Sequence, residues 1–203
     1  MPETKLRYFN GRALGEPIRF LLSYLNRDFE DIRFEPEEWP SIKPTMPFGK
    51  APILEIEGKV VHQSTAICRY LGAEAGLAGK NNWENLQIDM AVDTFHDFRQ
   101  ACANFQYLED ETLKAKKKAQ VLKDVVPEFL QKFDNLVKEN GGYIANGKLS
   151  WGDLYVVGIS TYIQFMIGYD PFEKYSNLSQ LRDKVEALPQ IKAWNAKRPK
   201  TEW

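Results

Sequence analysis

Cysteine is scarce in this sequence. The 203 residues include only Cys68 and Cys102, and these two form neither a CxxC pair nor a metal-ligand spacing. Two isolated thiols fit a reducing compartment. We therefore expect both to be ordinary core residues and the protein to be cytoplasmic.

Neither sign of charge is in excess. Lys and Arg total 27, Asp and Glu total 28, and the formal net charge is −1. No basic face is implied, which makes nucleic acids and anionic membranes poor candidates as partners.

Long apolar runs are also missing. The longest, around Val156–Gly168, is interrupted by Ser, Thr and Gln and is too short to cross a bilayer. The first four residues, Met1 to Thr4, do not begin a signal-peptide apolar segment. A content of 43% hydrophobic and 27% charged residues is typical of a soluble globular protein.

Strand and helix patterns alternate over residues 1–78. The patterns predict strands at Lys5–Phe9, Phe29–Phe34, Ile53–Ile56 and Val60–His62, helices at Glu16–Leu25 and Ser64–Ala75, and a short proline-flanked segment at Glu35–Ile42. Glu57-Gly58-Lys59 is expected to be the loop of the hairpin. This β-α-β-α-β-β-α order predicts a small mixed sheet between helices.

From residue 79 onward the sequence contains only helix patterns. Helices are predicted at Trp83–Glu109, Thr112–Lys138, Leu178–Leu188 and Pro189–Lys197, and a capping box at Ser150–Asp153 opens a further helix that is apolar nearly all round. A helix of that kind is buried. The change near residue 78 predicts two domains, an α/β domain over 1–78 and an all-α domain over 79–203.

The hairpin is flanked by two features that suggest a binding site. Pro52 cannot donate a hydrogen bond to a ladder, so it belongs at the first residue of a strand or in a tight turn, in the trans or the cis form. Ser64 is a natural N-cap, and the free N–H groups at a helix start bind anions. Together they predict a place where a carboxylate binds.

Six motifs, in order, carry a resemblance to a known family. They are YFNGRALGEPIRFLLSY at Tyr8–Tyr24, W-P-x-x-K at Trp39–Lys43, G-K-x-P-I-L-E at Gly49–Glu55, H-Q-S at His62–Ser64, V-D-T-x-x-D-F at Val92–Phe98 and S-W-G-D at Ser150–Asp153. The chain resembles cytosolic glutathione transferases of the sigma class, closest to insect members, a class that includes prostaglandin D synthases. The resemblance runs from Lys5 to Trp203. It implies a thioredoxin-like N-terminal domain, an all-helical C-terminal domain and a homodimer.

The resemblance implies that Tyr8 donates its hydroxyl proton to the sulfur of glutathione. The thiolate is the nucleophile, and a free thiol with a pKa near ~8.5 is mostly protonated at neutral pH. A hydrogen bond to the charged form lowers that pKa. Thioredoxin-type redox chemistry would need a cysteine near Tyr8, and the sequence has none there.

The other glutathione contacts are also implied by the resemblance. They come from Trp39, Lys43 and Lys50 at the glycyl end, Ala51 beside a cis Pro52 at the cysteinyl backbone, Gln63 and Ser64 at the γ-glutamyl carboxylate, and Asp97 of the partner subunit at the ammonium group. Asp97 also belongs to a stripe with Asp89 and Asp93, where like charges four residues apart repel, so water or a cation is expected nearby. Vertebrate members hold a divalent ion with an aspartate where this chain has His96, so no metal is expected here.

The second substrate is expected to meet the helical domain. The predicted electrophile pocket consists of Gly11, Leu14, Arg99, Asn104, Tyr107, Tyr155 and Ile159. Vertebrate synthases have arginine in place of Leu14 and tryptophan in place of Asn104. For each of these seven residues a simple packing role is an open alternative.

The resulting hypothesis is a glutathione transferase that conjugates glutathione to hydrophobic electrophiles, with lipid-peroxidation carbonyls such as hydroxyalkenals as the expected substrates. A glutathione-dependent prostaglandin isomerase is the second candidate. A structural protein on the same fold and a non-catalytic ligand carrier are the others. The joint presence of Tyr8, Gln63, Ser64 and Asp97 argues against a purely structural role, because such a protein needs none of them.

Overall fold

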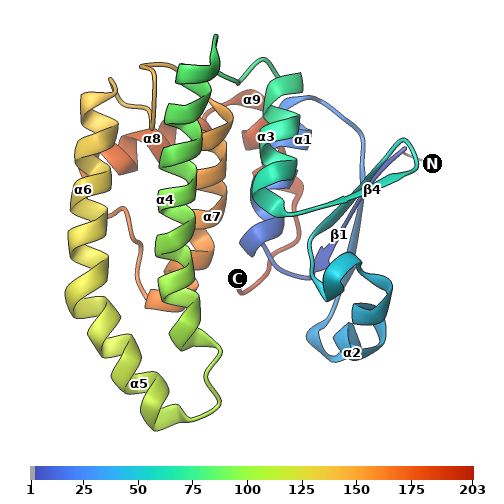
Figure 1. The fold of residues 1–203 in the computed structure, drawn as a ribbon, viewed down its shortest axis with the longest axis horizontal. Helices are drawn as coiled ribbons and strands as arrows, with labels where there is room; N and C mark the ends of the chain where they lie inside the picture. The colour runs from blue at the N-terminus through green and yellow to red at the C-terminus, as the bar shows by residue number, and fades with distance from the viewer. Residues whose placement is uncertain (1–2) are drawn as a thin grey trace.

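The computed structural model describes residues 3–203, and its strands all lie in the first third of the chain (Figure 1). The four strands are β1 (Thr4–Phe9), β2 (Glu30–Phe34), β3 (Ile53–Ile56) and β4 (Lys59–His62), in the spatial order β2-β1-β3-β4. β1 and β2 are parallel, whereas β3 is antiparallel to both β1 and β4. A parallel pair needs a crossover connection, and α1 (Glu16–Tyr24) supplies it. The predicted order of elements is confirmed.

The two faces of the sheet are covered by different elements. α1 and α3 (Ser64–Glu74) lie between the sheet and the helical region (Figure 1). Alternate strand residues point to opposite faces, so Leu54 enters the main core while Ile53 joins a smaller cluster. That smaller cluster packs against α2 (Trp39–Ile42).

The hairpin loop is shorter than the sequence suggested. Ile56 pairs with Lys59, so Lys59 belongs to β4 and the loop consists of Glu57 and Gly58 alone. Their φ values of 51° and 74° are both positive, as a type I′ turn requires. The three-residue loop prediction is wrong by one residue, because this turn matches the twist of the strands without a third.

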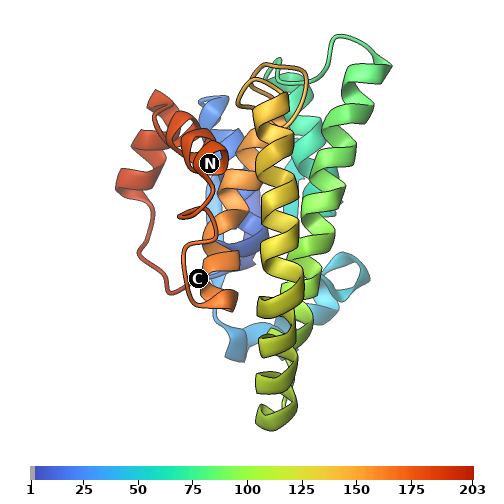
Figure 2. The ribbon, with the colours of Figure 1, turned by 90° about the vertical axis from the view of Figure 1, so that its left-hand side faces the viewer.

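Six helices follow in the remaining chain. They are α4 (Asn82–Gln106), α5 (Glu111–Gln120), α6 (Val126–Glu139), α7 (Trp151–Ile167), α8 (Ser176–Glu186) and α9 (Pro189–Lys197). α5 and α6 form one long rod beside α4 (Figure 2), interrupted by a π-helical turn over Val121–Val125. The helix predicted over Thr112–Lys138 is therefore confirmed, with a local π-helical turn that the sequence pattern did not predict. Pro127 lacks an N–H group and crowds the preceding turn, which explains the wider turn just before it.

α7 is the central helix of the core. The Ser150 N–H and hydroxyl groups donate to Asp153 at 2.7 and 2.8 Å, which confirms the predicted capping box. Gly158 lets α7 approach α1, because a Cβ there would lie 3.0 Å from the backbone of Pro17. One continuous buried cluster therefore joins the sheet side to the helical side.

The predicted boundary between two domains at residue 78 stays a prediction.

No helix described over residues 3–203 is both long and apolar enough to cross a membrane.

Candidate functional site

A cleft of about 250 Å³ opens where the end of the sheet region faces α4. Its lining residues come from the loop after β1, the segment before β3, the end of β4, the start of α3 and the middle of α4: Leu14, Pro47, Phe48, Lys50, Ala51, Pro52, His62, Gln63, Ser64, His96, Arg99 and Gln100. Seven of these are residues that the sequence assigned to the site (Leu14, Lys50, Ala51, Pro52, Gln63, Ser64 and Arg99). His96 and Gln100 were not assigned to it.

One side of the cleft is formed by backbone groups between Lys50 and Ser64. The Ala51–Pro52 peptide bond is cis, as the resemblance implied. Ser64 is the first residue of α3, and the N-cap is Gln63, so the assignment of the cap to Ser64 is wrong by one residue. Gln63 makes no side-chain capping bond and has φ 73° and ψ 99°, a sparsely populated conformation for a residue with a side chain.

The start of α3 is consequently an open anion site. The first N–H groups of a helix have no partners within it, and the helix dipole is positive at that end. Ser64 is buried at this point, with the exposed Gln63 before it. A carboxylate in the cleft could accept from these N–H groups.

Tyr8, near the end of β1, is not itself one of the lining residues of the cleft, but it lies next to the cleft through its contact with Leu14, which is one. Its side chain is only 5% exposed. The hydroxyl oxygen accepts a hydrogen bond of 3.3 Å from the Leu14 N–H, and none of the described residues accepts its proton. Burial raises the pKa of Tyr8 well above its usual value, a shift that the Leu14 bond opposes only in part. The hydroxyl therefore stays protonated and available as a donor.

The residues predicted for the glycyl end are divided between two places. Lys50 lines the cleft. Trp39 stacks on Phe34, with ring centroids 5.7 Å apart and planes 9° apart, and Lys43 is exposed with its stem over Gly49. Neither Trp39 nor Lys43 is part of the cleft lining.

The acidic stripe of α4 consists of Asp89, Asp93 and Asp97, and one of these three carboxylates is paired with a cation. Asp89 pairs with Arg69 of α3 at 2.8 Å, so the cation expected near the stripe is a side chain. Asp93 and Asp97 are exposed. Within residues 3–203 no group of three or more His, Cys, Asp or Glu side chains could hold a metal ion.

The other side of the cleft contains a hydrogen-bonded chain of side chains. Nη2 of Arg99 lies 3.1 Å from Nε2 of His96, and Nδ1 of His96 lies 2.9 Å from the Tyr155 hydroxyl. Arginine can only donate, so Nε2 of His96 accepts and the ring proton sits on Nδ1. Burial, reinforced by Arg99, lowers the pKa of His96 below its usual value and favours this neutral form.

The chain terminus lies against the loop after β1, near Leu14 of the cleft lining, although Trp203 is not itself a lining residue. The Trp203 carbonyl accepts from the Arg12 N–H at 2.7 Å. Its ring lies over Gly11, where a Cβ atom would come within 2.2 Å of the indole. Trp203 also lies beside Tyr162, at 6.2 Å between ring centroids, and the Tyr162 and Tyr107 hydroxyls are hydrogen-bonded. Gly11 and Tyr107 were both predicted to belong to the electrophile pocket. The structure connects them through Trp203 and Tyr162, which the sequence did not indicate.

Of the seven residues predicted for the electrophile pocket, only Leu14 and Arg99 line the cleft, and the other five (Gly11, Asn104, Tyr107, Tyr155 and Ile159) lie outside its lining. Asn104 is exposed and accepts a hydrogen bond from Gln100 at 3.0 Å. Ile159 is 0% exposed and belongs to the main core. For Ile159 the packing alternative is the one that the structure supports, because α7 is buried on that face.

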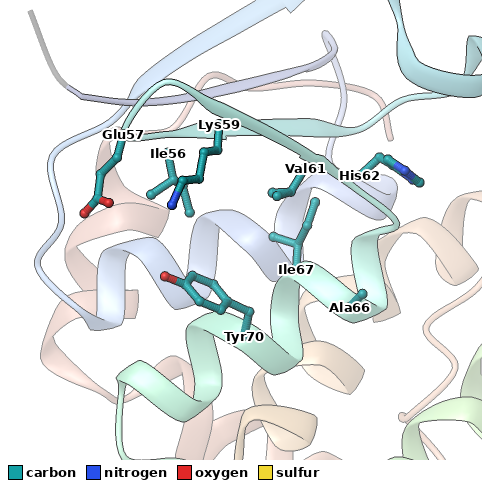
Figure 3. Close-up of a pocket in the computed structure, with 8 residues that line it drawn as sticks. All are labelled: Ile56, Glu57, Lys59, Val61, His62, Ala66, Ile67 and Tyr70. Atoms are coloured by element: carbon teal, nitrogen blue, oxygen red, sulfur yellow. The ribbon is translucent and has the colours of Figure 1, made fainter.

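Two apolar recesses lie outside this cleft, and the first of them borders it at His62. One, of about 380 Å³, separates β4 from α3 and is lined by Ile56, Val61, Ile67 and Tyr70 among others (Figure 3). The other, of about 270 Å³, lies between α4 and α6, with Met90 at its rim. Close to the first, Phe48 is 85% exposed and packs on His62.

Comparison with known proteins gave matches over the whole chain. Two family models match, "Glutathione S-transferase, N-terminal domain" at residues 4–73 and "Glutathione S-transferase, C-terminal domain" at residues 96–198. A glutathione S-transferase of Anopheles gambiae is 47% identical over 202 residues, which is 100% of both chains.

Solved structures agree with this result. The structure of prostaglandin synthase D of Nilaparvata lugens is 51% identical, with a TM-score of 0.95 over 98% of this chain and 100% of that one. Rat hPGDS in complex with a quinoline is 39% identical, with a TM-score of 0.90 over 100% of both chains.

Proposed function

This chain belongs to the glutathione S-transferase family, and we propose that it conjugates glutathione to hydrophobic electrophiles, above all unsaturated carbonyls formed by lipid peroxidation. The observation that carries the proposal is the buried, protonated hydroxyl of Tyr8 beside the cleft. A donor held in an apolar environment next to an open helix start suits a ligand with a thiolate and a carboxylate.

Glutathione binds along the backbone side of the cleft in this proposal. Its γ-glutamyl carboxylate accepts from the start of α3 at Gln63 and Ser64. Its cysteinyl backbone pairs with the N–H and C=O groups of Ala51, as an added strand would. Lys50, Lys43 and Trp39 receive the glycyl end.

Tyr8 then favours the thiolate form of bound glutathione. A hydrogen bond to a charged group is worth roughly 1.5–3 kcal/mol. One pKa unit corresponds to about 1.36 kcal/mol, so one such bond lowers the thiol pKa by about one to two units. From a starting value near ~8.5, this makes thiolate the main form at pH 7.

The reaction is an addition to the electrophile. The thiol proton leaves to solvent, and the sulfur forms a bond to the β-carbon of the unsaturated carbonyl. The electron pair of the C=C bond moves toward the carbonyl oxygen, and the α-carbon takes up a proton. No oxidant or metal takes part in this balance.

We also expect a homodimer in which Asp97 of one protomer faces the ammonium group of the other protomer's glutathione. Exposed Phe48 and the β4–α3 recess (Figure 3) offer one apolar surface, and the α4–α6 recess offers a second. A two-fold axis would set the first surface of each protomer against the second of its partner.

Asp97→Ala tests this arrangement, with Asp93→Ala as its control one turn earlier on the same exposed face. Asp97→Ala should weaken glutathione binding in calorimetry, and Asp93→Ala should leave it unchanged. Sedimentation should give a dimer for the parent protein. Equal glutathione affinity in all three proteins would remove Asp97 from the site.

A glutathione-dependent prostaglandin isomerase is the second candidate, favoured by the likeness to solved prostaglandin D synthases. The deciding assay offers a chloronitrobenzene, a hydroxyalkenal and a prostaglandin endoperoxide, each with and without glutathione. Conjugation of the first two supports the transferase proposal, and isomerisation of the third supports the second candidate. Glutathione binding without any turnover would instead mean a structural protein or a ligand carrier. The cytoplasmic location stays a prediction from the two isolated cysteines, and the lack of nucleic-acid or membrane partners stays a prediction from the charge balance.

A further inference from the structure

Arg99 is a buried cation with no carboxylate partner. Arg99 is only 7% exposed. It forms none of the ion pairs found among residues 3–203. Nη2 donates to two neutral groups, the His96 ring at 3.1 Å and the Gln100 amide oxygen at 2.8 Å. Nε is buried, and no described residue accepts its proton.

The other fully buried arginine of the core shows what a structural arginine looks like here. Arg19 pairs with Glu16 at 3.1 Å and with Asp31 at 3.0 Å. Its charge is therefore balanced by two carboxylates inside the fold, and this charge balance is the difference from Arg99, since Nη2 of Arg19 is also buried without a partner among the described residues. An unbalanced buried charge is costly, so Arg99 has a free capacity for an anion that Arg19 lacks.

The position of Arg99 decides which anion it meets. It lines the same cleft as Leu14, whose N–H group donates to the Tyr8 hydroxyl. It projects from α4, across the cleft from the backbone groups at Ala51 and Pro52. Arg99 thus faces the space on the electrophile side of the sulfur site.

His96 holds this guanidinium without neutralising it. An acidic residue in its place would pair with Arg99 and cancel its charge. The neutral imidazole accepts one hydrogen bond through Nε2 and is itself fixed by the Tyr155 hydroxyl on Nδ1. Both N–H groups of Nη2 are used by His96 and Gln100, and Nε is buried, so Nη1 is the nitrogen left to donate a charge-assisted hydrogen bond to a ligand carboxylate.

We infer that Arg99 binds a carboxylate carried by the electrophile, and that His96 is the positioning residue that keeps Arg99 unpaired. The preferred substrates are then unsaturated carbonyls whose hydrocarbon chain ends in a carboxylate, as oxidised fatty-acid fragments do. This inference rests on the proposed transferase function and specifies its substrate class.

The test compares an ω-carboxylated unsaturated aldehyde with its methyl ester at saturating glutathione. The parent protein should prefer the acid. In Arg99→Gln the acid-to-ester ratio of kcat/KM should fall about tenfold, since a hydrogen bond to a charged group is lost. Arg27→Gln, which alters a surface arginine paired with Glu74, should keep the parent ratio.

Substitutions of His96 test its positioning role while Arg99 itself is kept. His96→Asp should pair with Arg99 and remove the acid preference, whereas His96→Gln keeps an acceptor and should retain most of it. The readout is the acid-to-ester ratio and its division between KM and kcat. A general loss of packing would lower turnover of acid and ester together and leave this ratio in place.

Three results would overturn the inference. The first is an equal loss for acid and ester in Arg99→Gln. The second is a loss of glutathione affinity with an unchanged acid-to-ester ratio, which would assign Arg99 to a glutathione carboxylate. The third is retention of the acid preference in His96→Asp. If no substrate is turned over at all, the proposed function fails, and calorimetric binding of the acid and the ester to parent and Arg99→Gln proteins still tests Arg99.

Discussion

The two sides of the cleft are built differently. The glutathione side is made by backbone from one short stretch of chain, residues 50–64, with a cis peptide bond at one end and an uncapped helix start at the other. The electrophile side is made by side chains from α4, α7 and the C-terminus, which are up to about a hundred residues apart. Backbone sites depend on turns and helix ends, whereas side-chain sites depend on how distant helices pack.

This difference predicts different responses to mutation. Single substitutions on the backbone side should change glutathione binding or thiol activation and leave electrophile selectivity alone. Substitutions on the side-chain side should change selectivity and leave glutathione binding alone.

Tyr8→Phe should have the largest effect, because it keeps the ring and removes the donor to sulfur. Turnover at pH 7 should fall by roughly ten- to a hundredfold, following the one to two pKa units estimated above. Glutathione affinity should change little. Raising the pH should restore much of the lost rate, since hydroxide then supplies the thiolate.

The check is the thiolate ultraviolet absorbance of the glutathione complex as a function of pH. Its midpoint should move upward in Tyr8→Phe. An unchanged midpoint together with unchanged turnover would mean that Tyr8 only packs in its strand.

Ser64→Ala should have the next largest effect, and on glutathione alone. Loss of a hydroxyl contact to a charged carboxylate should weaken glutathione binding by about tenfold, while the KM for the electrophile stays close to the parent value. Ser160→Ala is the matched control, because that buried hydroxyl bonds only to the Val157 carbonyl of its own helix. Calorimetry that shows the same glutathione affinity in both variants would remove the Ser64 hydroxyl from the carboxylate site and leave only the backbone N–H groups of the helix start as donors.

Gly11→Ala should have a smaller effect, on the electrophile side alone. The new Cβ atom would lie 2.2 Å from the Trp203 ring and must displace the indole. Aromatic contacts of this kind are worth about 0.5–1.5 kcal/mol, or roughly two- to tenfold in the KM of an aromatic electrophile. Glutathione affinity should be retained.

Combining Gly11→Ala with Trp203→Ala gives a double-mutant cycle. In the Trp203→Ala background Gly11→Ala should add no further change, because the ring that it would displace is gone. Additive effects of the two substitutions would show that Trp203 does not cover this part of the cleft.

The contrast between the two sides also explains what could be predicted from the sequence. Pro52 before an apolar run, Gly58 in the hairpin and Ser64 at a helix start are local signals, and each predicted its element to within one residue. The errors there, at Lys59 and Gln63, are shifts of a boundary that turn geometry decides. Local chemistry was sufficient to predict the backbone side of the cleft.

The sequence signals for the side-chain side of the cleft were weaker. Nothing in the sequence around Trp203 indicates that it returns to Gly11, because that contact depends on the packing of α8 and α9. His96 was considered only as a missing metal ligand, and its bonds to Arg99 and Tyr155 depend on how α4 faces α7. Ile159 had the right residue type for a pocket but lies on the buried face of α7.

The smallest expected effect is a change of stability with pH that arises from His96, on the electrophile side of the cleft. The pKa of His96 is lowered in the folded state by burial and by Arg99, against the opposing charges of Asp97 and Asp93. The unfolded chain therefore binds this proton more readily. The contribution of His96 to stability is complete above its unfolded pKa of about 6.5 and decreases as the pH falls below it.

The measurement is the free energy of unfolding by urea between pH 7.5 and 5.5 for the parent protein and His96→Gln. The parent should lose more stability than the variant over this range, because glutamine does not titrate. Once the pH falls below the lowered pKa of folded His96, the acid-to-ester ratio of the parent should also fall, since a protonated Nε2 can no longer accept from Arg99, while glutathione affinity should change less. Identical pH profiles of stability in the two proteins would show that the His96 ring does not gain its proton on unfolding, and would remove the distinction in pH response between the two sides of the cleft.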